Sequence, residues 1–503
     1  MRSIKSRFVA TLTSNVLRTG LTFLTTIILA RALGPTAYGE LIFLLGSFAA
    51  SRQILDAGTS TAFYTFIAQR SRGQQFLLFY FSWLLAQFLI PLFFIGILFP
   101  DTWIEQIWRG YDKLLILEAL VAVFLQQQLW QSVTQIGESA RLNVSVQALN
   151  LAVSLVHLSL IGLGGYFNLL GVATVLALIG AEYLFALFLG YRLFVRPALS
   201  EPTEDFRNVL ADYFTQCRPL VIYAWVGFAY SFFDNWMLNR FAGAQEQAYF
   251  SMGNQFALLC VVPTTALLQI YWKEVAEAHG RNEPERITYL FERASRIVYA
   301  MTAMICGLLL PWSREIMNHL LGPAYQGGWV VLALMLIFSL HVSLSQVTSA
   351  TMFAAGEMRW QTRWGIGYML VSIPISYIVL APTDAVIPGL GLGATGMALK
   401  VLFLQFLLVN ATLWRIAHRK QWRFSGWYQG YVIAITILPG WLSRYVAVAF
   451  WGGDDIMSLL RSVMTCSAIY LTFQVCVIRL RPGWLGLDGV DYKRVQKVFS
   501  QKT

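Results

Sequence analysis

The chain alternates between long apolar runs and short polar connections, a pattern typical of a protein that crosses a membrane many times. Residues 75–100 and 144–165 contain no lysine, arginine, aspartate or glutamate. Each run is long enough to cross a hydrocarbon layer of about 30 Å as a helix. The runs do not alternate apolar and polar residues, as the strands of a membrane barrel would. We therefore predict an all-α polytopic membrane protein.

Apolar runs of spanning length recur along the whole chain. The first half has six, at residues 9–33, 40–68, 76–99, 114–139, 143–163 and 169–194. The second half has six more, at residues 219–241, 248–272, 288–310, 329–354, 364–380 and 391–416. Two further runs follow, at residues 428–450 and 456–478. We expect about fourteen transmembrane helices.

The two halves repeat one helix-corner-helix unit. Both corners carry an arginine, a glycine three residues later and a tyrosine that opens the next run: Arg31, Gly34 and Tyr38, then Arg240, Gly243 and Tyr249. Shorter matches follow in the same order, with LFP and LLP at 98–100 and 309–311, and GE at 137–138 and 356–357. Because each half has an even number of spans, the two copies should be related by an axis along the membrane normal.

This repeat predicts the domain organisation of the chain. We expect an N-terminal six-helix lobe at 1–196, a cytoplasmic linker at 197–218 and a C-terminal six-helix lobe at 219–417. Two additional transmembrane helices at 428–479 and a basic cytoplasmic tail at 480–503 should follow.

The basic residues are unevenly divided between the two sides of this topology. If the N-terminus is cytoplasmic, five of the 37 lysines and arginines fall in external loops, five fall inside spans, and all others are cytoplasmic. Cytoplasmic loops of membrane proteins are enriched in these residues. We therefore place both termini in the cytoplasm. The net charge of +11 then reflects loop charge and does not indicate nucleic-acid binding.

The composition argues against several kinds of chemistry. The chain is 57% hydrophobic and 13% charged, with a mean hydropathy of +0.58. It has no phosphate-binding loop ending in Gly-Lys-Ser/Thr. Its five cysteines and five histidines have no metal or redox spacing. A membrane glycosyltransferase would carry its catalytic groups in large external loops, and the loops here are short. We expect no enzyme activity, no cofactor and no metal.

Charged residues inside the spans are the main functional candidates, because such charges usually face the protein interior or water. Arg18 lies in the first span, with no acidic partner nearby in sequence. Arg52 and Asp56 share one face of the second span, so they either neutralise each other or take part in transport. Asp234 of the seventh span and Lys400 of the twelfth could pair, as a structural contact or a titratable switch.

A stripe of amides runs along the fourth span. Gln127, Gln131 and Gln135 recur every four residues, which places them on one helical face. A single glutamine in a span usually joins two helices. A whole stripe is more typical of a polar path, and amides both donate to and accept from sugar hydroxyls. With cations that attract phosphate, the stripe favours a glycolipid phosphate over a cationic drug.

Other polar residues in the spans have a stronger structural interpretation. We interpret His157 as a hydrogen-bonded interior histidine. Glu118 and Glu182 are weaker candidates for ion binding, because each fits a helix interface. Arg444 and Arg461 lie in the two spans outside the repeat, and we interpret them as peripheral residues that extend to the membrane surface.

Residues 28–41, with the sequence ILARALGPTAYGEL, are followed by LDAG at 55–58. This pattern closely resembles bacterial polysaccharide-biosynthesis flippases, the Wzx-type transporters of the multidrug/oligosaccharidyl-lipid/polysaccharide (MOP) superfamily. The similarity is sharpest over the N-terminal segment, and the plan of twelve spans plus two extends it along the chain. It implies two six-helix bundles around a central cavity and a location in the bacterial cytoplasmic (inner) membrane.

The resemblance also implies a function. Such flippases move an undecaprenyl-diphosphate-linked oligosaccharide from the inner to the outer leaflet by ion-coupled alternating access. Cations in the cavity would hold the diphosphate, a role that Arg18, Arg52 and Lys400 fit by depth and charge. Asp234 or Asp56 would carry the coupling ion. The expected partners are the lipid-linked oligosaccharide, membrane lipids and a polysaccharide polymerase complex, with the transporter itself a monomer.

Three alternatives stay open. Lipid II flippases share the two-lobe plan and fourteen spans, but their arginine-rich first helix is missing here, where Arg18 stands largely alone. Multidrug and toxin extrusion antiporters keep an acidic residue in the first helix of a lobe, a position that Asp234 occupies in the second lobe. A scaffold for a polysaccharide-synthesis complex is the third.

Overall fold

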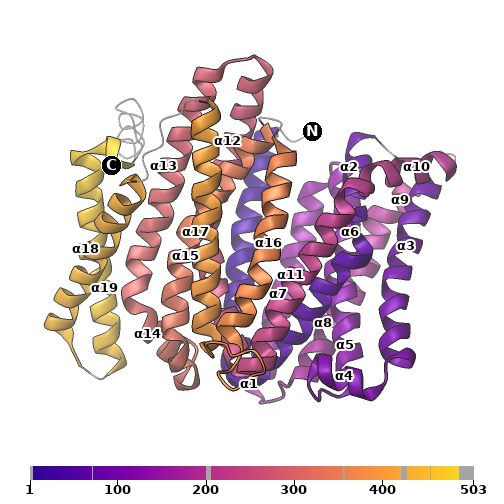
Figure 1. Cartoon of the computed structure of the whole chain (residues 1–503), viewed down its shortest axis with the longest axis horizontal. Coiled ribbons are helices and arrows are strands. Elements are labelled where there is room, and N and C mark those ends of the chain that lie inside the picture. Colours follow the sequence, from indigo (N-terminus) through magenta and orange to yellow (C-terminus); the bar gives the residue numbers. More distant parts are fainter. Residues whose placement is uncertain are drawn as a thin grey trace. The chain divides into compact units, whose positions relative to one another are not determined.

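The computed structural model describes residues 4–70, 72–199, 206–354, 357–420, 427–453 and 455–485. Every regular element in these ranges is a helix (Figure 1). Eleven of the described helices are long and apolar enough to cross a membrane, or up to twelve if the bent helix at Ala244–Gly280 counts as one span. The predicted all-α polytopic class is confirmed. The centre of the predicted linker and most of the basic tail lie outside the described residues.

The helices of the first half follow the expected spans closely. They are α1 (Ile4–Asp56), α2 (Thr59–Gln69), α3 (Gln74–Phe93), α4 (Asp101–Trp108), α5 (Lys113–Val123), α6 (Trp130–Ser139), α7 (Asn143–Tyr166), α8 (Val172–Gly190), α9 (Arg196–Ala198) and α10 (Phe206–Cys217). Three π-helical turns extend or join them: η1 (Phe94–Leu98), η2 (Phe124–Leu129) and η3 (Tyr191–Val195). The first expected span and the first part of the second, up to Asp56, are the two arms of α1 on either side of Gly34.

The helices of the second half also follow the expected spans. Its helices are α11 (Val221–Ala242), α12 (Ala244–Gly280), α13 (Pro284–Leu309), α14 (Ser313–Glu315), α15 (Trp329–Ala354), α16 (Met358–Leu380), α17 (Gly393–Lys420), α18 (Trp427–Trp451) and α19 (Ile456–Leu480). The short 3-10 turns η4 (Arg218–Leu220), η5 (Leu310–Trp312), η7 (Pro323–Gly328) and η8 (Pro482–Leu485) and the π turn η6 (Ile316–Leu320) lie at helix ends.

The chain divides into two compact units. The first contains Met1–Ser251, Leu320–Tyr325 and Met369–Met397, and the second contains Met252–His319, Gln326–Tyr368 and Ala398–Thr503. These units follow packing and do not coincide with the sequence repeat. The lobe boundaries at 196 and 219 therefore stay a prediction.

The two repeated corners of the first unit share one backbone conformation. Gly34 has φ 73° and ψ 170°, and Gly243 has φ 92° and ψ 173°. Glycine adopts this region readily because it has no Cβ. In Figure 1, α1 descends from the N-terminus at the top to its corner at the bottom and returns to α2 at the top. The glycines matched in sequence therefore make the same turn.

The corners pack directly on each other. A methyl group added at Gly39 would lie 1.7 Å from the Ala244 carbonyl oxygen, so the two backbones meet with no side chain between them. Around this contact the Tyr325 hydroxyl donates to the Ala30 carbonyl at 3.0 Å. The Glu246 carboxylate accepts from the Ala394 amide, at the start of α17, at 2.7 Å. This end of the first unit is one hydrogen-bonded layer.

The expected span at 40–68 is interrupted, which corrects the sequence-based boundary. Helix α1 ends at Asp56 and α2 begins at Thr59. Between them, Ala57 and Gly58 have positive φ values of 43° and 90°. The apolar run continues through this turn, so hydropathy alone did not reveal the break.

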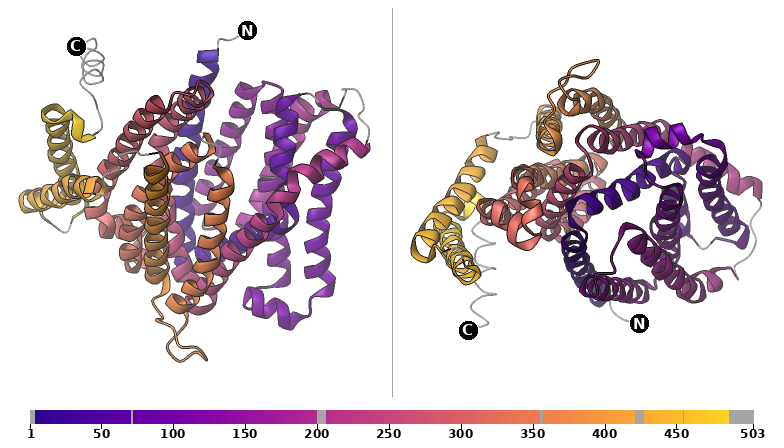
Figure 2. Two further views of the ribbon diagram at one scale, coloured as in Figure 1. Left: turned by 45° about the horizontal axis from the view of Figure 1, so that its top comes forward. Right: turned by 90° about the horizontal axis from the view of Figure 1, so that it is seen from below.

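In the second unit, α13 packs against α15 and α18, and α18 packs against α19. Figure 2 shows α18 and α19 side by side at the yellow end of the chain. A methyl group added at Gly440 of α18 would lie 1.9 Å from the Gly307 carbonyl oxygen of α13. Such close backbone contact fastens the additional helices to the helices of the second repeat.

Arg444 also joins α18 to this unit. Its guanidinium donates to the Glu315 carboxylate and lies over the rings of Trp312 and Trp441, 5.2 Å and 5.7 Å from their centroids. Arg444 thus has an acidic partner on a neighbouring element, and its interpretation as a residue that extends to the membrane surface stays a prediction. Its acidic partner is 129 residues away in sequence, which is why the sequence did not indicate it.

The corner contact gives a stability prediction. Gly39→Ala should destabilise the protein by about 1–3 kcal/mol, because the new methyl group overlaps backbone that cannot rotate away. Gly20→Ala is the matched control, since Gly20 lies on the same helix with nothing within 4 Å of the added carbon. Thermal unfolding of the purified protein in detergent measures both. Equal unfolding temperatures for the two variants would contradict the close corner contact.

Candidate functional site

A small polar cavity in the first unit brings together five of the eight predicted site residues. Its volume is about 10 Å³, close to the room needed for one water molecule. The residues that line it come from α1, α2, α3, η2 and α6: Arg52, Asp56, Ser60, Tyr80, Leu84, Gln87, Gln127, Gln128, Gln131, Ser132 and Gln135. The members of the predicted group are Arg52, Asp56, Gln127, Gln131 and Gln135.

The amide side of this cavity is built on a π-helical turn. The fourth span, expected at 114–139, runs from Lys113 to Ser139 in the structure, but residues Phe124–Leu129 form η2 in place of regular α-helix. A π turn is wider than an α turn and shifts the register of the side chains that follow. Gln128 consequently lines the same cavity as Gln127 and Gln131. The sequence predicted the stripe of Gln127, Gln131 and Gln135 but not this turn.

Arg52 holds the cationic side of the cavity. Its Nη1 atom donates to the Gln127 carbonyl oxygen at 2.6 Å and approaches Oε1 of Gln131 at 3.4 Å. The carbonyl belongs to the π turn, so the guanidinium bonds directly to the irregular backbone. Its side chain is half-buried. Arg52 therefore connects α1 to η2 and places a positive charge at the cavity wall.

Asp56 does not neutralise Arg52 in the described part of the chain, where no ion pair joins the two. Its Oδ1 atom accepts from the Ser60 amide and the Thr59 hydroxyl, each at 3.0 Å, and Oδ2 accepts from the Ser60 hydroxyl at 2.9 Å. These donors lie in the first turn of α2, so the carboxylate caps that helix. Its predicted role in ion coupling stays a prediction.

Sequence reasoning missed the contribution of α3. Tyr80 is buried and its hydroxyl is 3.2 Å from the Ser132 hydroxyl, while Gln87 lies 3.5 Å from Thr59. Gln87 is a single amide within an otherwise apolar span, which was the available signal. Among described atoms, the side-chain oxygens of Gln87, Gln128 and Gln135 are buried without a hydrogen-bond partner. The cavity therefore has unused polar capacity.

The corner of α1 brings Arg18 and Arg52 to a similar depth. Arg18 precedes Gly34 by 16 residues and Arg52 follows it by 18, which places them roughly 24 Å and 27 Å from the corner along their helical arms. The Arg18 side chain is exposed, and its charge acts on Glu138 of α6 and Tyr183 of α8. In the described residues no ion pair includes Arg18.

The remaining predicted residues, Asp234 and Lys400, are not among those that line the cavity. Asp234 is buried in α11 and accepts a hydrogen bond from the Ser376 hydroxyl of α16, within the first unit. Lys400 is buried in α17, in the part that belongs to the second unit. Pairing between Asp234 and Lys400 therefore stays a prediction.

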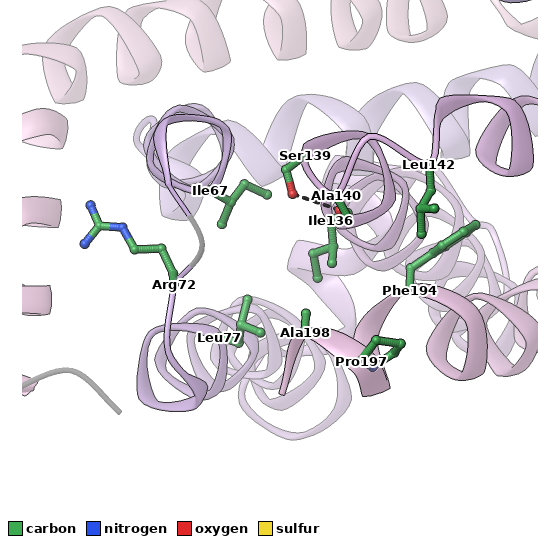
Figure 3. Close-up of a pocket in the computed structure, with 10 residues that line it drawn as sticks. All are labelled: Ile67, Arg72, Leu77, Ile136, Ser139, Ala140, Leu142, Phe194, Pro197 and Ala198. Carbon is green, nitrogen blue, oxygen red and sulfur yellow. Dashed lines mark hydrogen bonds between the residues drawn. The ribbon is translucent and has the colours of Figure 1, made fainter. Parts of the chain in front are cut away.

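A larger cavity of about 290 Å³ lies at the other end of α6 and has different chemistry. Figure 3 shows Ile67, Leu77 and Phe194 among its walls, while the Arg72 guanidinium points away. That guanidinium pairs with Asp212 of α10 at 3.2 Å. The Ser139 hydroxyl donates to the Ile136 carbonyl. The lining is mostly hydrocarbon, and no predicted site residue belongs to it.

Comparisons with known proteins support the fold. No protein-family model and no curated protein sequence matches the chain. The solved structure of the lipid II flippase MurJ in an inward closed conformation matches with a TM-score of 0.69 and 14% identity, covering 94% of this chain and 99% of that one. The chain has the fold of the MOP-superfamily transporters.

Two further solved structures of that superfamily cover less of the chain. An inward-facing multidrug resistance MATE family transporter matches with a TM-score of 0.57 and 17% identity, covering 82% of this chain and 99% of that one. A transporter from Pyrococcus furiosus matches with a TM-score of 0.54 and 14% identity, covering 82% and 94%. At such identities the likeness concerns the fold alone.

Two substitutions of Asp56 separate its role as a helix cap from the effect of its negative charge. Asp56→Ala should lower the free energy of unfolding by about 1 kcal/mol, because the Ser60 amide at the start of α2 loses its acceptor. Asp56→Asn keeps one acceptor oxygen and should unfold close to the wild-type temperature. Detergent-solubilised protein gives both values. A loss with Asn as large as with Ala would show that the negative charge itself stabilises the site.

Proposed function

We propose that this chain is a flippase that moves an undecaprenyl-diphosphate-linked oligosaccharide from the inner to the outer leaflet of the bacterial cytoplasmic membrane. The observation that carries the proposal is the placement of Arg18 and Arg52. Two arginines at similar depth on the two arms of α1 lie in the same unit as a cavity lined with amides.

The charges suit a diphosphate. A guanidinium presents paired N–H groups that match the oxygens of a phosphate. Arg18 is exposed, so it can bind an anion without first breaking an ion pair. Arg52 is fixed by the Gln127 carbonyl, and this contact orients the remaining N–H groups. A cationic drug would be repelled by the same two residues.

The amides suit the sugar part of the ligand. Gln127, Gln131 and Gln135 offer donors and acceptors for hydroxyl groups, and the unpartnered oxygen of Gln135 adds capacity. The cavity of about 10 Å³ is too small for a sugar ring. Binding must therefore separate α1 from η2 and α6, which agrees with a transporter that alternates between conformations.

The layer formed by the two corners suits a second role in this transport cycle, that of a closure on the external side. Gly39 and Ala244 are in backbone contact at the end that the charge distribution predicts to be external. We propose that this layer closes the external side while the inner side receives the lipid, and that it separates when the oligosaccharide leaves. Asp234, buried beneath the layer with Ser376, is our candidate for the coupling ion.

A lipid II flippase is the second candidate function, and one observation favours it. The MurJ structure covers 94% of the chain, whereas the MATE structure and the Pyrococcus furiosus transporter each cover 82% of it. Both lipid substrates carry a diphosphate on a polyprenyl chain, so the same arginines would serve either one. The two proposals differ only in the glycan that reaches the amides.

Arg18 provides the main test. In proteoliposomes with a fluorescent undecaprenyl-diphosphate oligosaccharide, Arg18→Ala should slow leaflet transfer roughly ten- to a hundredfold, the value of a hydrogen bond to a charged group. Arg18→Lys should keep part of the rate, because it preserves the charge and loses the fork. Transfer by Arg18→Ala at the wild-type rate would contradict the proposal.

Arg461→Ala is the matched control for that assay. Arg461 is another exposed arginine within a span, but it lies over the Trp451 ring in the additional helices. Its loss should leave transfer unchanged. Repeating the assay with lipid II and with a cationic dye separates the alternatives. Transfer of lipid II alone would favour the second candidate, and transport of the dye alone would favour an antiporter.

A further inference from the structure

His157 and Glu182 form a hydrogen-bonded pair inside the bundle of the first unit. Nδ1 of His157 on α7 is 2.7 Å from Oε2 of Glu182 on α8. The Glu182 side chain is only 4% exposed, and its second oxygen, Oε1, is buried without a hydrogen-bond partner among described atoms. The His157 side chain is 24% exposed. A buried carboxylate with one free oxygen in a membrane span is unfavourable unless it has a function or a further ligand.

A stripe of polar side chains leads along α7 to this pair. The positions are separated by four, three, four and three residues, so all lie on one helical face: Asn143, Gln147, Asn150, Ser154 and His157. The stripe is roughly 21 Å long at 1.5 Å per residue. It starts at the end of α7 that the charge distribution predicts to be cytoplasmic.

The stripe faces neighbouring helices inside the bundle. The Trp130 indole donates to Oδ1 of Asn150 at 3.0 Å, and the Ser154 hydroxyl donates to the Asn150 carbonyl at 3.0 Å. Gln147 and Asn150 are buried. Among described atoms, Oδ1 of Asn143 and Oε1 of Gln147 are buried without partners. With water bound between them, these acceptors would give a proton a hydrogen-bonded route.

The charged and titratable neighbours of the pair come from the helices packed on α7 and α8. They are Arg18 on α1, Glu118 on α5, Glu138 on α6 and Tyr183 on α8, with Arg31, Lys113, Arg141 and Arg192 at the helix ends. Tyr183 lies in the electrostatic range of both Glu182 and Arg18. Arg52 and Asp56 of α1 have their own partners at the cavity. The shared neighbour Tyr183 therefore links the pair to Arg18 electrostatically.

We propose that the His157–Glu182 pair is a proton-binding site connected to the cytoplasmic side by the polar stripe of α7. Histidine is the side chain that titrates closest to neutral pH. When a proton binds, the neutral imidazole becomes imidazolium and the carboxylate stays ionised. The pair then changes from net charge −1 to zero, and no other bond forms or breaks.

This change in charge reaches the substrate site. A net negative pair attracts Arg18 and competes with an anionic ligand for it, and the protonated pair does not. Proton binding and diphosphate binding should therefore strengthen each other, because coupling between two sites is reciprocal. This step rests on the proposed function, whereas the proton site itself does not.

Direct proton counting tests the site without any lipid substrate. Purified full-length protein is brought from about pH 8 to about pH 5 and its proton uptake is measured by titration. Glu182→Gln and His157→Gln should each take up about one proton fewer than wild type, and the double variant no fewer than either. Equal uptake by wild type and Glu182→Gln would overturn the proposal.

A second measurement guards against variants that fold poorly. Wild-type protein with isotope-labelled histidine should show an imidazolium infrared band that grows over the same pH range, and Glu182→Asp should shift its midpoint. The proposal fails if no imidazolium band of the labelled wild type grows over this pH range with a midpoint that depends on Glu182. Loss of lipid transfer with intact proton uptake would instead contradict the flippase function alone.

The stripe has its own control. Gln147→Leu interrupts the polar face and should slow the approach to full proton uptake in stopped-flow measurements, without changing the number of protons bound. Ser159→Ala lies on another face of α7, where its hydroxyl donates only to the Leu155 carbonyl. It should change neither quantity. An unchanged rate for Gln147→Leu would overturn the proposed route.

Discussion

A polar group in the hydrocarbon layer has to find its partner inside the protein, and this constraint explains the unusual local geometry of the first unit. The chain turns at Ala57 and Gly58 within an apolar run, and the Ser60 amide at the start of α2 donates to Asp56. The π turn η2 interrupts another helix, and Arg52 bonds to its Gln127 carbonyl. Irregular backbone and half-buried side-chain charge therefore occur together, because each satisfies the other.

The same constraint favours contact through backbone where two helices must come close. At the corners, Gly39 lies against the Ala244 carbonyl, and in the second unit Gly440 lies against the Gly307 carbonyl. In a membrane, association of helices depends on close packing and not on removal of apolar surface from water. Glycines at these contacts allow the closest approach. The repeated corner is thus a packing element as well as a turn, which its sequence echo alone did not indicate.

The features that could be predicted are those that depend on residues close together in the sequence. Hydropathy placed the spans, and the echo of Arg31 and Gly34 at Arg240 and Gly243 located two turns with matching dihedral angles. Candidate residues were found by charge and depth, but their partners were not, because Arg444 pairs with Glu315 and Arg52 with Gln127 across long sequence separations. Spacing on one helix cannot reveal the opposite wall of a site.

The polar stripe of α7 is a second example of a pattern on one helix that does not reveal its partner on another helix. Its spacing was present in the sequence, yet His157 and Glu182 each fitted an ordinary interface when considered alone. Only their 2.7 Å separation makes them a pair. A periodic polar pattern within an apolar span therefore deserves the same weight as an apolar pattern within a soluble helix, because both mark the face that meets other helices.

The fold is shared by transporters with different cargoes, so it cannot decide which cargo this chain carries. The sign of the charge at the site is more informative. Arg18 is exposed and Arg52 is bonded to neutral groups, so neither cation is cancelled by a carboxylate in the described chain. A transporter of cationic drugs needs the opposite arrangement. If the His157–Glu182 pair also sets how strongly Arg18 attracts an anion, substrate selectivity and proton binding would depend on the same cation.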